Sequence, residues 1–372
     1  MLFLPFALAA AIVAPADSVP RATAPSPRPA PATAQGASAD SAPRIKILAV
    51  PALTSQPETG FAFAALGYLL HLPADGSRPG QYEFGAQITQ KSQWRIFGDV
   101  DRWWGQNAWR VQGQLEYRVY PLPFYGNGPT APKANEEIYT AQGVLASGTL
   151  QRRLSPRLFV QGGFRLSALE IDDVKDGGLL EPDTIPGARG ATFVQWRSAL
   201  LFDTRDDILA PQRGAFVTLG AGAAIPNLIS GGWSYTRANV DARVYRTRGR
   251  VTLAAQAVAE GLTGSAPFDD LPLLGTKSYM RGYALGRYRD RALAAAQIET
   301  RVRVKGRLVL AAFAGGGEVA RNFQSMSLGR LLPSYGAGAR WRIFATSQAH
   351  LRLDIASGHD GRAFYLNLNE AF

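Results

Sequence analysis

Apolar and polar residues alternate over long segments of this chain. In the segment 107–120, NAWRVQGQLEYRVY, the odd positions are mostly apolar and the even positions mostly charged or amide. A period of two places successive side chains on opposite faces of a β-strand. The same period returns in four more segments, namely 158–169, 193–203, 294–304 and 341–355.

The length of these segments separates two architectures that both alternate, a soluble β-sandwich and a membrane barrel. Soluble strands average about five or six residues, whereas a strand needs about 9 to 11 residues to cross a bilayer at a tilt. Many segments here are as long as a strand that crosses a bilayer, so a membrane barrel is favoured over a soluble β protein. We expect sixteen strands near 45–54, 59–71, 81–91, 93–104, 107–120, 137–153, 155–170, 190–204, 212–225, 231–247, 249–262, 291–304, 306–319, 333–345, 347–357 and 362–372.

The connections between the expected strands alternate in length. Short turns recur at every second junction, at GQN (105–107), LSP (154–156), RG (248–249), KG (305–306) and TS (346–347). Several of the other connections are long: 121–136, 171–189, 263–290 and 320–332. Tight periplasmic turns, longer outer loops and an even strand count are typical of outer-membrane barrels. The sequence therefore predicts an all-β fold, a 16-stranded antiparallel transmembrane β-barrel with both termini on the periplasmic side.

The N-terminal region differs from the rest in composition. Residues 1–16 contain an apolar run followed by small residues, as in a cleaved secretory signal. Residues 17–43 are rich in Pro and Ala and lack a hydrophobic period, which predicts a disordered tether. The barrel is expected to form one domain over residues 44–372.

Composition argues against metal, cofactor and catalytic chemistry. The chain has no cysteine and three histidines, too scattered for a metal cage, and it contains no GxSxG, P-loop or HExxH motif. His350, Ser347 and Asp354 have the residue types of a hydrolase triad, but within one strand Ser347 points away from the other two. We expect no enzymatic activity, no metal and no cofactor.

An arginine- and tyrosine-rich stretch, TKSYMRGYALGRYRDR (276–291), stands between the expected eleventh and twelfth strands. Together with the formal charge of +11, it first suggests nucleic-acid binding. An exported barrel meets little nucleic acid, so no nucleic-acid partner is expected. A solvated surface loop is the other plain interpretation of this stretch.

Four segments carry a family resemblance. The loop contains the triplet Arg281, Gly282 and Tyr283, and the segment 51–70 forms a candidate opening hairpin. A candidate strand and turn at 200–220 contains Asp203, Arg205, Asp206, Pro211 and Gly214, and the chain ends with an alternating Phe364, Leu366 and Leu368 followed by a terminal Phe372. Together these resemble the outer-membrane assembly superfamily of BamA, TamA, the two-partner secretion transporters and the bacterial surface antigens. The last of the four resembles the C-terminal signal by which outer-membrane barrels are recognised.

The resemblance implies a specific role for the Arg-Gly-Tyr loop. In that family the loop folds back into the barrel lumen, and its arginine pairs with carboxylates of the inner wall. We expect Glu299 and Asp354 to be the partners of Arg281. The chain departs from the family pattern at Gly315, where relatives often have an aspartate. The other charges expected in the lumen need no specific binding role, because the interior of such a barrel is lined by polar side chains.

The resemblance also implies function and location. A BamA/TamA-type barrel in the outer membrane of a Gram-negative bacterium is expected to assist the insertion or translocation of polypeptides through a seam between its first and last strands. The chain is similar to a barrel-only member lacking POTRA docking domains, which would work with a separate periplasmic docking partner or a client polypeptide. The expected partners also include outer-membrane lipid with lipopolysaccharide, and the barrel-assembly machinery that inserts it. A passive anion-preferring channel and a structural surface-antigen barrel remain as alternatives.

Overall fold

The computed structural model describes residues 44–75, 77–226, 228–229, 232–342 and 350–372. These residues form sixteen β-strands and short 3-10 turns, without an α-helix among them. The first eight strands are β1 (Arg44–Gln56), β2 (Gly60–Leu72), β3 (Gly80–Thr89), β4 (Trp94–Trp104), β5 (Trp109–Phe124), β6 (Glu137–Ser155), β7 (Leu158–Asp172) and β8 (Gly190–Asp203). The next eight are β9 (Gly214–Ala224), β10 (Ser234–Arg248), β11 (Val251–Ser265), β12 (Ala292–Lys305), β13 (Leu308–Ala320), β14 (Leu332–Arg342), β15 (His350–Gly358) and β16 (Gly361–Leu368).

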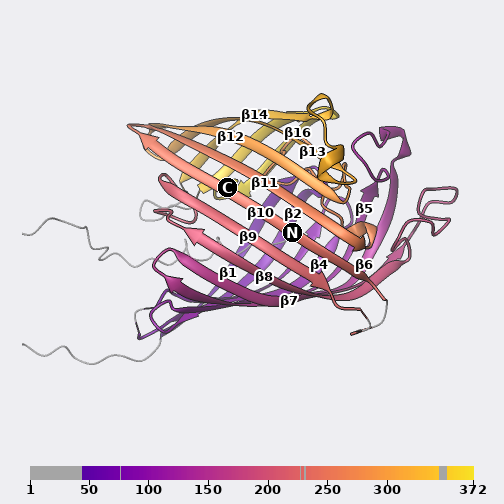
Figure 1. Cartoon of the computed structure of the whole chain (residues 1–372). Coiled ribbons are helices and arrows are strands. Elements are labelled where there is room, and N and C mark those ends of the chain that lie inside the picture. Colours follow the sequence, from indigo (N-terminus) through magenta and orange to yellow (C-terminus); the bar gives the residue numbers. More distant parts are fainter. Residues whose placement is uncertain (1–43, 76, 227, 230–231, 343–349) are drawn as a thin grey trace, which may run out of the picture.

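Each strand pairs antiparallel with its neighbours in the sequence, and β16 pairs with β1, so the sheet closes into a barrel (Figure 1). Closure joins the two edge strands of the sheet, whose free backbone groups lipid could not satisfy with hydrogen bonds. The predicted all-β, 16-stranded antiparallel barrel is therefore confirmed. The predicted signal peptide and tether, residues 1–16 and 17–43, lie outside the described residues.

Alternation along the strands produces an apolar outside and a polar inside. On β12, Glu299 and Arg301 are buried on the inner face, whereas Ile298 on the outer face is 55% exposed. The outer faces of the other strands carry further exposed apolar side chains, among them Phe84, Leu115 and Trp196. An outward band of this kind is what hydrocarbon stabilises.

The connections follow the predicted alternation of short and long. Two-residue turns join β10 to β11 and β12 to β13, and each starts with a glycine at positive φ, 59° at Gly249 and 58° at Gly306. The long connections at the other end are 125–136, 173–189, 266–291 and 321–331. Strand β5 continues to Phe124, four residues beyond the prediction. The predicted turn at 346–347 lies outside the described residues.

The seam between β1 and β16 is the weakest junction of the described barrel. Its recorded register is one pair, Ser55 opposite Leu366. The next shortest junctions, such as β15 with β16, pair eight residues, and β1 pairs with β2 along its whole length. Since each lost pair removes backbone hydrogen bonds, this junction costs least to separate.

The end of the chain corrects one prediction. The last strand was predicted to run through 362–372, but β16 ends at Leu368, because Asn369 has a left-handed backbone with φ of 60° that turns the chain inward. Phe364 of the predicted C-terminal signal is on the outer face, at 42% exposure. Phe372 instead is 4% exposed and packs against Tyr245, with ring centroids 6.4 Å apart.

Candidate functional site

The connection between β11 and β12, residues 266–291, is the longest in the described barrel. Its two arms are held together by an isolated bridge between Leu273 and Arg289 and by a hydrogen bond from Leu274 N to Tyr288 O of 2.9 Å. At its tip, the Thr276 hydroxyl accepts hydrogen bonds from the backbone N–H groups of Ser278 and Tyr279. A turn of this kind gives a polar loop a defined shape. It presents Arg281, Gly282 and Tyr283 at the inner face of the last strands.

Gly282 occupies a position that other residues could not share. Its φ is 107°, and a Cβ there would lie 2.7 Å from the backbone carbon of Ser357 on β15. Its backbone N–H donates to the Tyr365 hydroxyl of β16 at 2.9 Å. The close approach places the neighbouring Arg281 against the wall.

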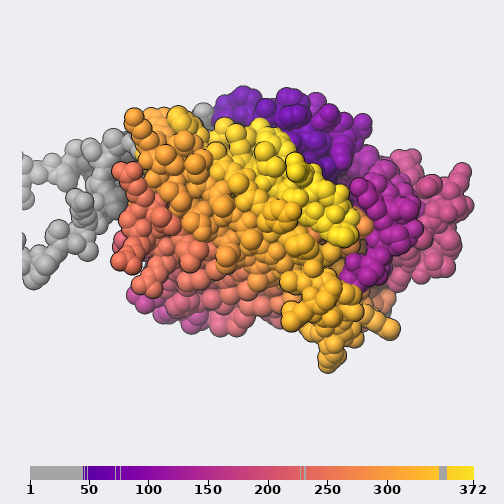
Figure 2. Space-filling view, turned by 90° about the horizontal axis from the view of Figure 1, so that it is seen from above, coloured from indigo at the N-terminus to yellow at the C-terminus, as the bar shows by residue number. Residues whose placement is uncertain are grey.

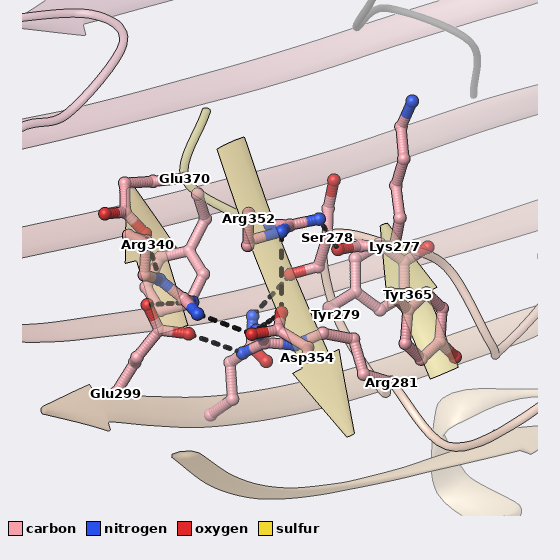
Figure 3. A network of polar contacts seen from close by, with 12 residues as sticks. Lys277, Ser278, Tyr279, Arg281, Glu299, Arg340, Arg352, Asp354, Tyr365 and Glu370 are labelled. Carbon is pink, nitrogen blue, oxygen red and sulfur yellow. Dashed lines mark hydrogen bonds and ion pairs between the residues drawn. The ribbon is translucent and has the colours of Figure 1, made fainter. Parts of the chain in front are cut away.

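Arg281 has no solvent exposure and reaches both expected partners. Its Nη2 lies 2.7 Å from Glu299 Oε2 of β12, and its Nη1 lies 2.7 Å from Asp354 Oδ2 of β15 (Figure 3). The guanidinium also lies over the ring of Phe313, 3.4 Å from its centroid. Burial of this cation is tolerated because both of its terminal nitrogens make charge-assisted hydrogen bonds.

The structure also shows how the chain does without an aspartate at Gly315. That glycine pairs with Gln297 of β12 and Ser334 of β14, and a Cβ there would lie 2.5 Å from the backbone oxygen of Ala296. The carboxylates come instead from β12 and β15, on either side of β13 and β14. Ser334 holds the loop through a hydroxyl bond to the Arg281 carbonyl of 2.5 Å.

Arg340 of β14 is a member of the site that the sequence reasoning missed. It is fully buried, and its Nη1 lies 2.5 Å from Asp354 Oδ1 while its Nη2 lies 3.2 Å from Glu299 Oε1. Gly338 makes room for this pair, since a Cβ there would lie 2.0 Å from Asp354 Oδ1. Successive side chains of β14 alternate between the two faces, so Gly338 and Arg340 share one face and the exposed Trp341 lies on the other. This alternation was the sequence signal for an inward-facing arginine.

The network extends from the loop to the end of the chain. Glu370 accepts from Arg340 Nε at 3.0 Å and lies 3.4 Å from Arg301 Nε. Arg301 also donates to Glu299 at 2.7 Å and to the backbone oxygen of Phe372 at 3.0 Å. The inward turn at Asn369 thus carries Glu370 and Phe372 into contact with the same arginines that surround the loop.

Arg352 of β15 completes the buried set. Its Nε lies 3.4 Å from Asp354 Oδ2, and its Nη2 donates to the Lys277 carbonyl at 3.1 Å. Four arginines therefore share three carboxylates in one contiguous network, and Figure 3 labels all of these residues except Arg301. Such a network fixes geometry more than it adds stability, because desolvation of the charges offsets their attraction.

The predicted turn motif between β8 and β9 is built around its own ion pair. Arg205 Nη2 lies 2.8 Å from Asp203 Oδ2, and Asp206 Oδ1 accepts from the backbone N–H groups of Gln212 and Arg213. Gly214 has a φ of 101°, and a Cβ there would lie 2.2 Å from the Thr204 oxygen. Local geometry thus explains Asp203, Arg205, Asp206 and Gly214 of this turn.

This turn also touches the network of the loop. The carbonyl of Pro211 accepts from Arg301 Nη1 at 3.5 Å, and the Leu209 carbonyl accepts from the Glu370 N–H at 3.3 Å. Two motifs about 70 residues apart in the sequence therefore meet at Arg301. The sequence reasoning treated them separately, since no local pattern connects them.

The first arm of the loop has a second attachment, to strands β7 and β10. Asp270 lies 2.5 Å from Arg165 Nη1 of β7 and 2.8 Å from Arg237 Nη2 of β10, and its Oδ2 accepts from the Tyr235 hydroxyl at 2.6 Å. Although burial raises the pKa of Asp270, the guanidiniums of Arg165 and Arg237 hold it below its ordinary value. Asp270 is another residue that the sequence reasoning missed, as it missed Arg340 and Glu370.

Aromatic packing supports the same attachment. Phe268, from the 3-10 turn η3 (Phe268–Asp270), is 1% exposed, and its ring contacts the rings of Phe124 and Tyr139 at centroid distances of 4.9 and 5.2 Å. Edge-to-face contacts of this kind stabilise the packing beyond the area that they bury. The loop is therefore attached at two places, by Asp270 and Phe268 to β5–β7 and β10, and by Arg281 to β12 and β15.

Tyr283 and Arg287 attach the outer part of the loop near the seam. The Tyr283 hydroxyl donates to the Pro333 carbonyl at 2.6 Å and accepts from the His359 N–H at 2.9 Å. Arg287 Nε lies 2.9 Å from Asp360, in the turn between β15 and β16. The loop thus contacts the strand that closes the barrel as well as its neighbours.

Several other inner-wall charges form local pairs. Arg110 pairs with Asp101, Arg95 with Glu116, and Arg243 with Asp241. Over the described ranges no group of histidine, cysteine and carboxylate residues could hold a metal. In the same part of the chain, no helix is long and apolar enough to cross a membrane. Ser347, considered for a triad with His350, lies outside the described residues.

Comparison with known proteins matches residues 79–372 to the Omp85 superfamily domain. Among solved structures, BamA from Haemophilus ducreyi lacking POTRA domains 1–3 is similar at a TM-score of 0.61 and 11% identity, over 88% of this chain and 70% of that chain. CdiB from Escherichia coli is similar at a TM-score of 0.56 and 12% identity, over 87% of this chain and 67% of that chain. CdiB from Acinetobacter baumannii is similar at a TM-score of 0.53 and 10% identity, over 87% of this chain and 59% of that chain. At these identities the likeness concerns the fold. A search of curated proteins gave no match.

Proposed function

This chain belongs to the Omp85 superfamily, and from that premise we propose that it inserts or translocates other polypeptides at the outer membrane of a Gram-negative bacterium. The observation that carries the proposal is the seam, where β1 and β16 share one recorded pair in the described barrel. A client strand could pair with β1 or β16 once they separate, since each then offers a row of free backbone groups. We further propose that both termini and the short turns face the periplasm, where clients arrive.

The loop 266–291 is proposed to act as a latch on that seam. Its Arg281 binds Asp354 of β15, and the N–H of its Gly282 binds Tyr365 of β16, so it holds the two strands on the C-terminal side of the seam. Its Asp270 holds β7 and β10. Release of the contacts made by Arg281 and Gly282 would free β15 and β16 to move, while the loop stays attached at Asp270.

Locking the seam tests the proposal directly. The chain lacks cysteine, so the double variant Ser55→Cys/Leu366→Cys places two thiols on opposed residues of β1 and β16. The matched control, Ser55→Cys/Phe61→Cys, joins β1 to β2 at an equally opposed pair and leaves the seam free. Geometry suits a disulfide in both, because opposed side chains lie close on one face.

The expected result is that oxidation of the seam pair abolishes insertion of client barrels into proteoliposomes, and that reductant restores it. The β1–β2 pair should remain active in both states. Equal activity of the oxidised and reduced seam variant would exclude a lateral opening. Comparison of the outer-membrane proteome with and without the protein identifies the clients, and an unchanged proteome would count against insertion altogether.

A passive anion channel is the second candidate, and one observation favours it. Arg197 of β8 donates to Gln195 at 2.5 Å, and within the described residues no carboxylate lies within ion-pair distance of it. An inner-wall cation of this kind favours anions. Planar-bilayer recording tests this, with Arg197→Gln expected to reduce anion preference if the channel function holds. The absence of any conductance would remove this candidate.

A further inference from the structure

The connection between β13 and β14, residues 321–331, lies against the outside of the barrel. Glu318 of β13 shares its outer face with Leu310, which is 47% exposed, yet Glu318 itself is 3% exposed. Its Oε2 accepts from the Ser327 N–H at 2.8 Å and its Oε1 from Arg330 Nε at 2.9 Å. Residues 325–330 therefore fold back over the lipid-facing surface, away from the lumen.

Apolar side chains of the same segment cover outward glycines. A Cβ on Gly261 of β11 would lie 2.7 Å from the Phe323 ring, and a Cβ on Gly316 of β13 would lie 2.7 Å from the Leu331 side chain. Both glycines lie on outer faces, by the alternation of their strands. In the space-filling view this part of the chain protrudes from the wall (Figure 2).

The protrusion has a defined shape. It consists of two 3-10 turns, η4 (Phe323–Ser325) and η5 (Leu328–Arg330). A reciprocal capping box between Asn322 and Ser325 closes the first, and the Ser327 hydroxyl accepts from the Gly329 N–H in the second. At the start of the second turn, Leu328 is 90% exposed. Its exposure is thus a feature of an ordered segment.

We propose that residues 321–331 form a membrane-contacting finger that seats Leu328, Phe323 and Leu331 in the outer-leaflet lipid at the rim of the barrel. The inference rests on the outer-membrane location and strand orientation of the proposed function. The occupant follows from continuity, because these side chains extend the apolar surface that Tyr335 of β14, 56% exposed, presents to the lipid. The exposed Arg321 at the edge of the finger suits phosphate-bearing headgroups.

Single cysteines allow the test, because the chain has none of its own. Leu328→Cys labelled with bimane is reconstituted in phosphatidylcholine vesicles with brominated acyl chains, which quench only nearby fluorophores. Leu310→Cys, on the lipid face of β13, is the positive control. Ala134→Cys, in the exposed 3-10 turn η2 (Lys133–Asn135), is the matched aqueous control. Heat-modifiable gel mobility checks that each variant is folded.

Quenching at position 328 should be close to that at position 310 and at least about twofold greater than at position 134. Quenching equal to that at position 134 would overturn the proposal. Pyrene excimers at position 328 in vesicles at low protein density would also overturn it, since they indicate a second copy as the occupant. The readout needs no client, so a failure here is distinct from a failure of the seam-locking experiment.

The headgroup contact is tested in the same way. In vesicles that contain lipid A, whose phosphates offer anionic partners, Arg321→Gln should reduce the quenching of bimane at position 328. In pure phosphatidylcholine the substitution should have no effect. Equal quenching with and without Arg321 in lipid A vesicles would exclude the phosphate contact.

Discussion

Arg281 of the loop and Arg340 of β14 share two carboxylate partners, Glu299 and Asp354. Each donates to Glu299 and to Asp354, at distances between 2.5 and 3.2 Å. The loop arginine therefore completes a set of charges that the wall has already assembled. Removal of the loop leaves Asp354 and Glu299 with arginine partners, which makes a reversible contact physically plausible. Because the two arginines share partners, a substitution at one of them also affects the contacts of the other.

We expect Arg281→Ala to lower stability less than Arg340→Ala. Arg340 has three carboxylate partners, since it also binds Glu370, whereas Arg281 has two. Loss of one partner from a buried ion pair typically costs about 3–5 kcal/mol. The temperature at which the folded gel band is lost measures the effect. Arg303→Ala, at an exposed strand end, is the control and should leave that temperature unchanged.

Charge reversal at Glu299 should fail to rescue Arg281→Glu. A new arginine at position 299 would face Arg301 and Arg340 as well as the new glutamate, so like charges would meet in a buried site. The double variant Arg281→Glu/Glu299→Arg should therefore be less stable than Arg281→Glu alone. Recovery of the folded band in the double variant would mean that Arg281 and Glu299 act as an isolated pair.

Gly338→Ala should destabilise the barrel and loosen the loop. A Cβ at that position would lie 2.0 Å from the Asp354 carboxylate and 2.7 Å from Arg340 Nη1, so the ion pairs must shift. Gly162→Ala on β7 is the matched control, because nothing lies within 4 Å of its Cβ position. Protease sensitivity of residues 276–291 is the measurement. Equal sensitivity of both variants would show that the network tolerates the extra methyl group.

Stability near neutral pH should depend on Glu58, in the turn between β1 and β2. Burial raises the pKa of Glu58 from 4.5 to about 7, while Lys277 of the loop opposes the rise. Between these values the folded state keeps a proton that the unfolded state has lost, so stability falls as pH rises from about 4.5 to about 7. Melting curves of folded-band loss from pH 5 to pH 8 should show this slope. Glu58→Gln should flatten it, and an unchanged slope would assign it to another group.

Asp270→Asn should release the first arm of the loop. The substitution removes the charge that Arg165 and Arg237 share, leaving two buried guanidiniums with fewer anionic partners. The neighbouring Asp269 is a matched control: burial and the charge of Asp270 raise its pKa, so Asp269→Asn costs little. A spin label in the loop should become more mobile in Asp270→Asn and not in Asp269→Asn. Equal mobility in both would exclude Asp270 as an attachment point.

The sequence by itself determined the barrel. Alternation is a local property, since successive side chains of a strand point to opposite faces whatever lies beside them, and lipid requires every strand to be paired. Strand number, the long connections and the position of the Arg-Gly-Tyr loop between β11 and β12 therefore followed from pattern. The same local alternation placed Glu299 and Asp354 on inner faces.

Only the tertiary structure decided which charges meet beyond Arg281 and its two expected partners. Arg340 and Asp270 drew no notice in the sequence, because their partners lie on strands distant along the chain and closure of the barrel brings them together. The end of β16 was also mistaken: alternation predicted a strand to residue 372, but the left-handed turn at Asn369 carries Glu370 and Phe372 inward to Arg301. Period-two patterns specify a face, whereas partners depend on register, curvature and the path of a loop across the barrel.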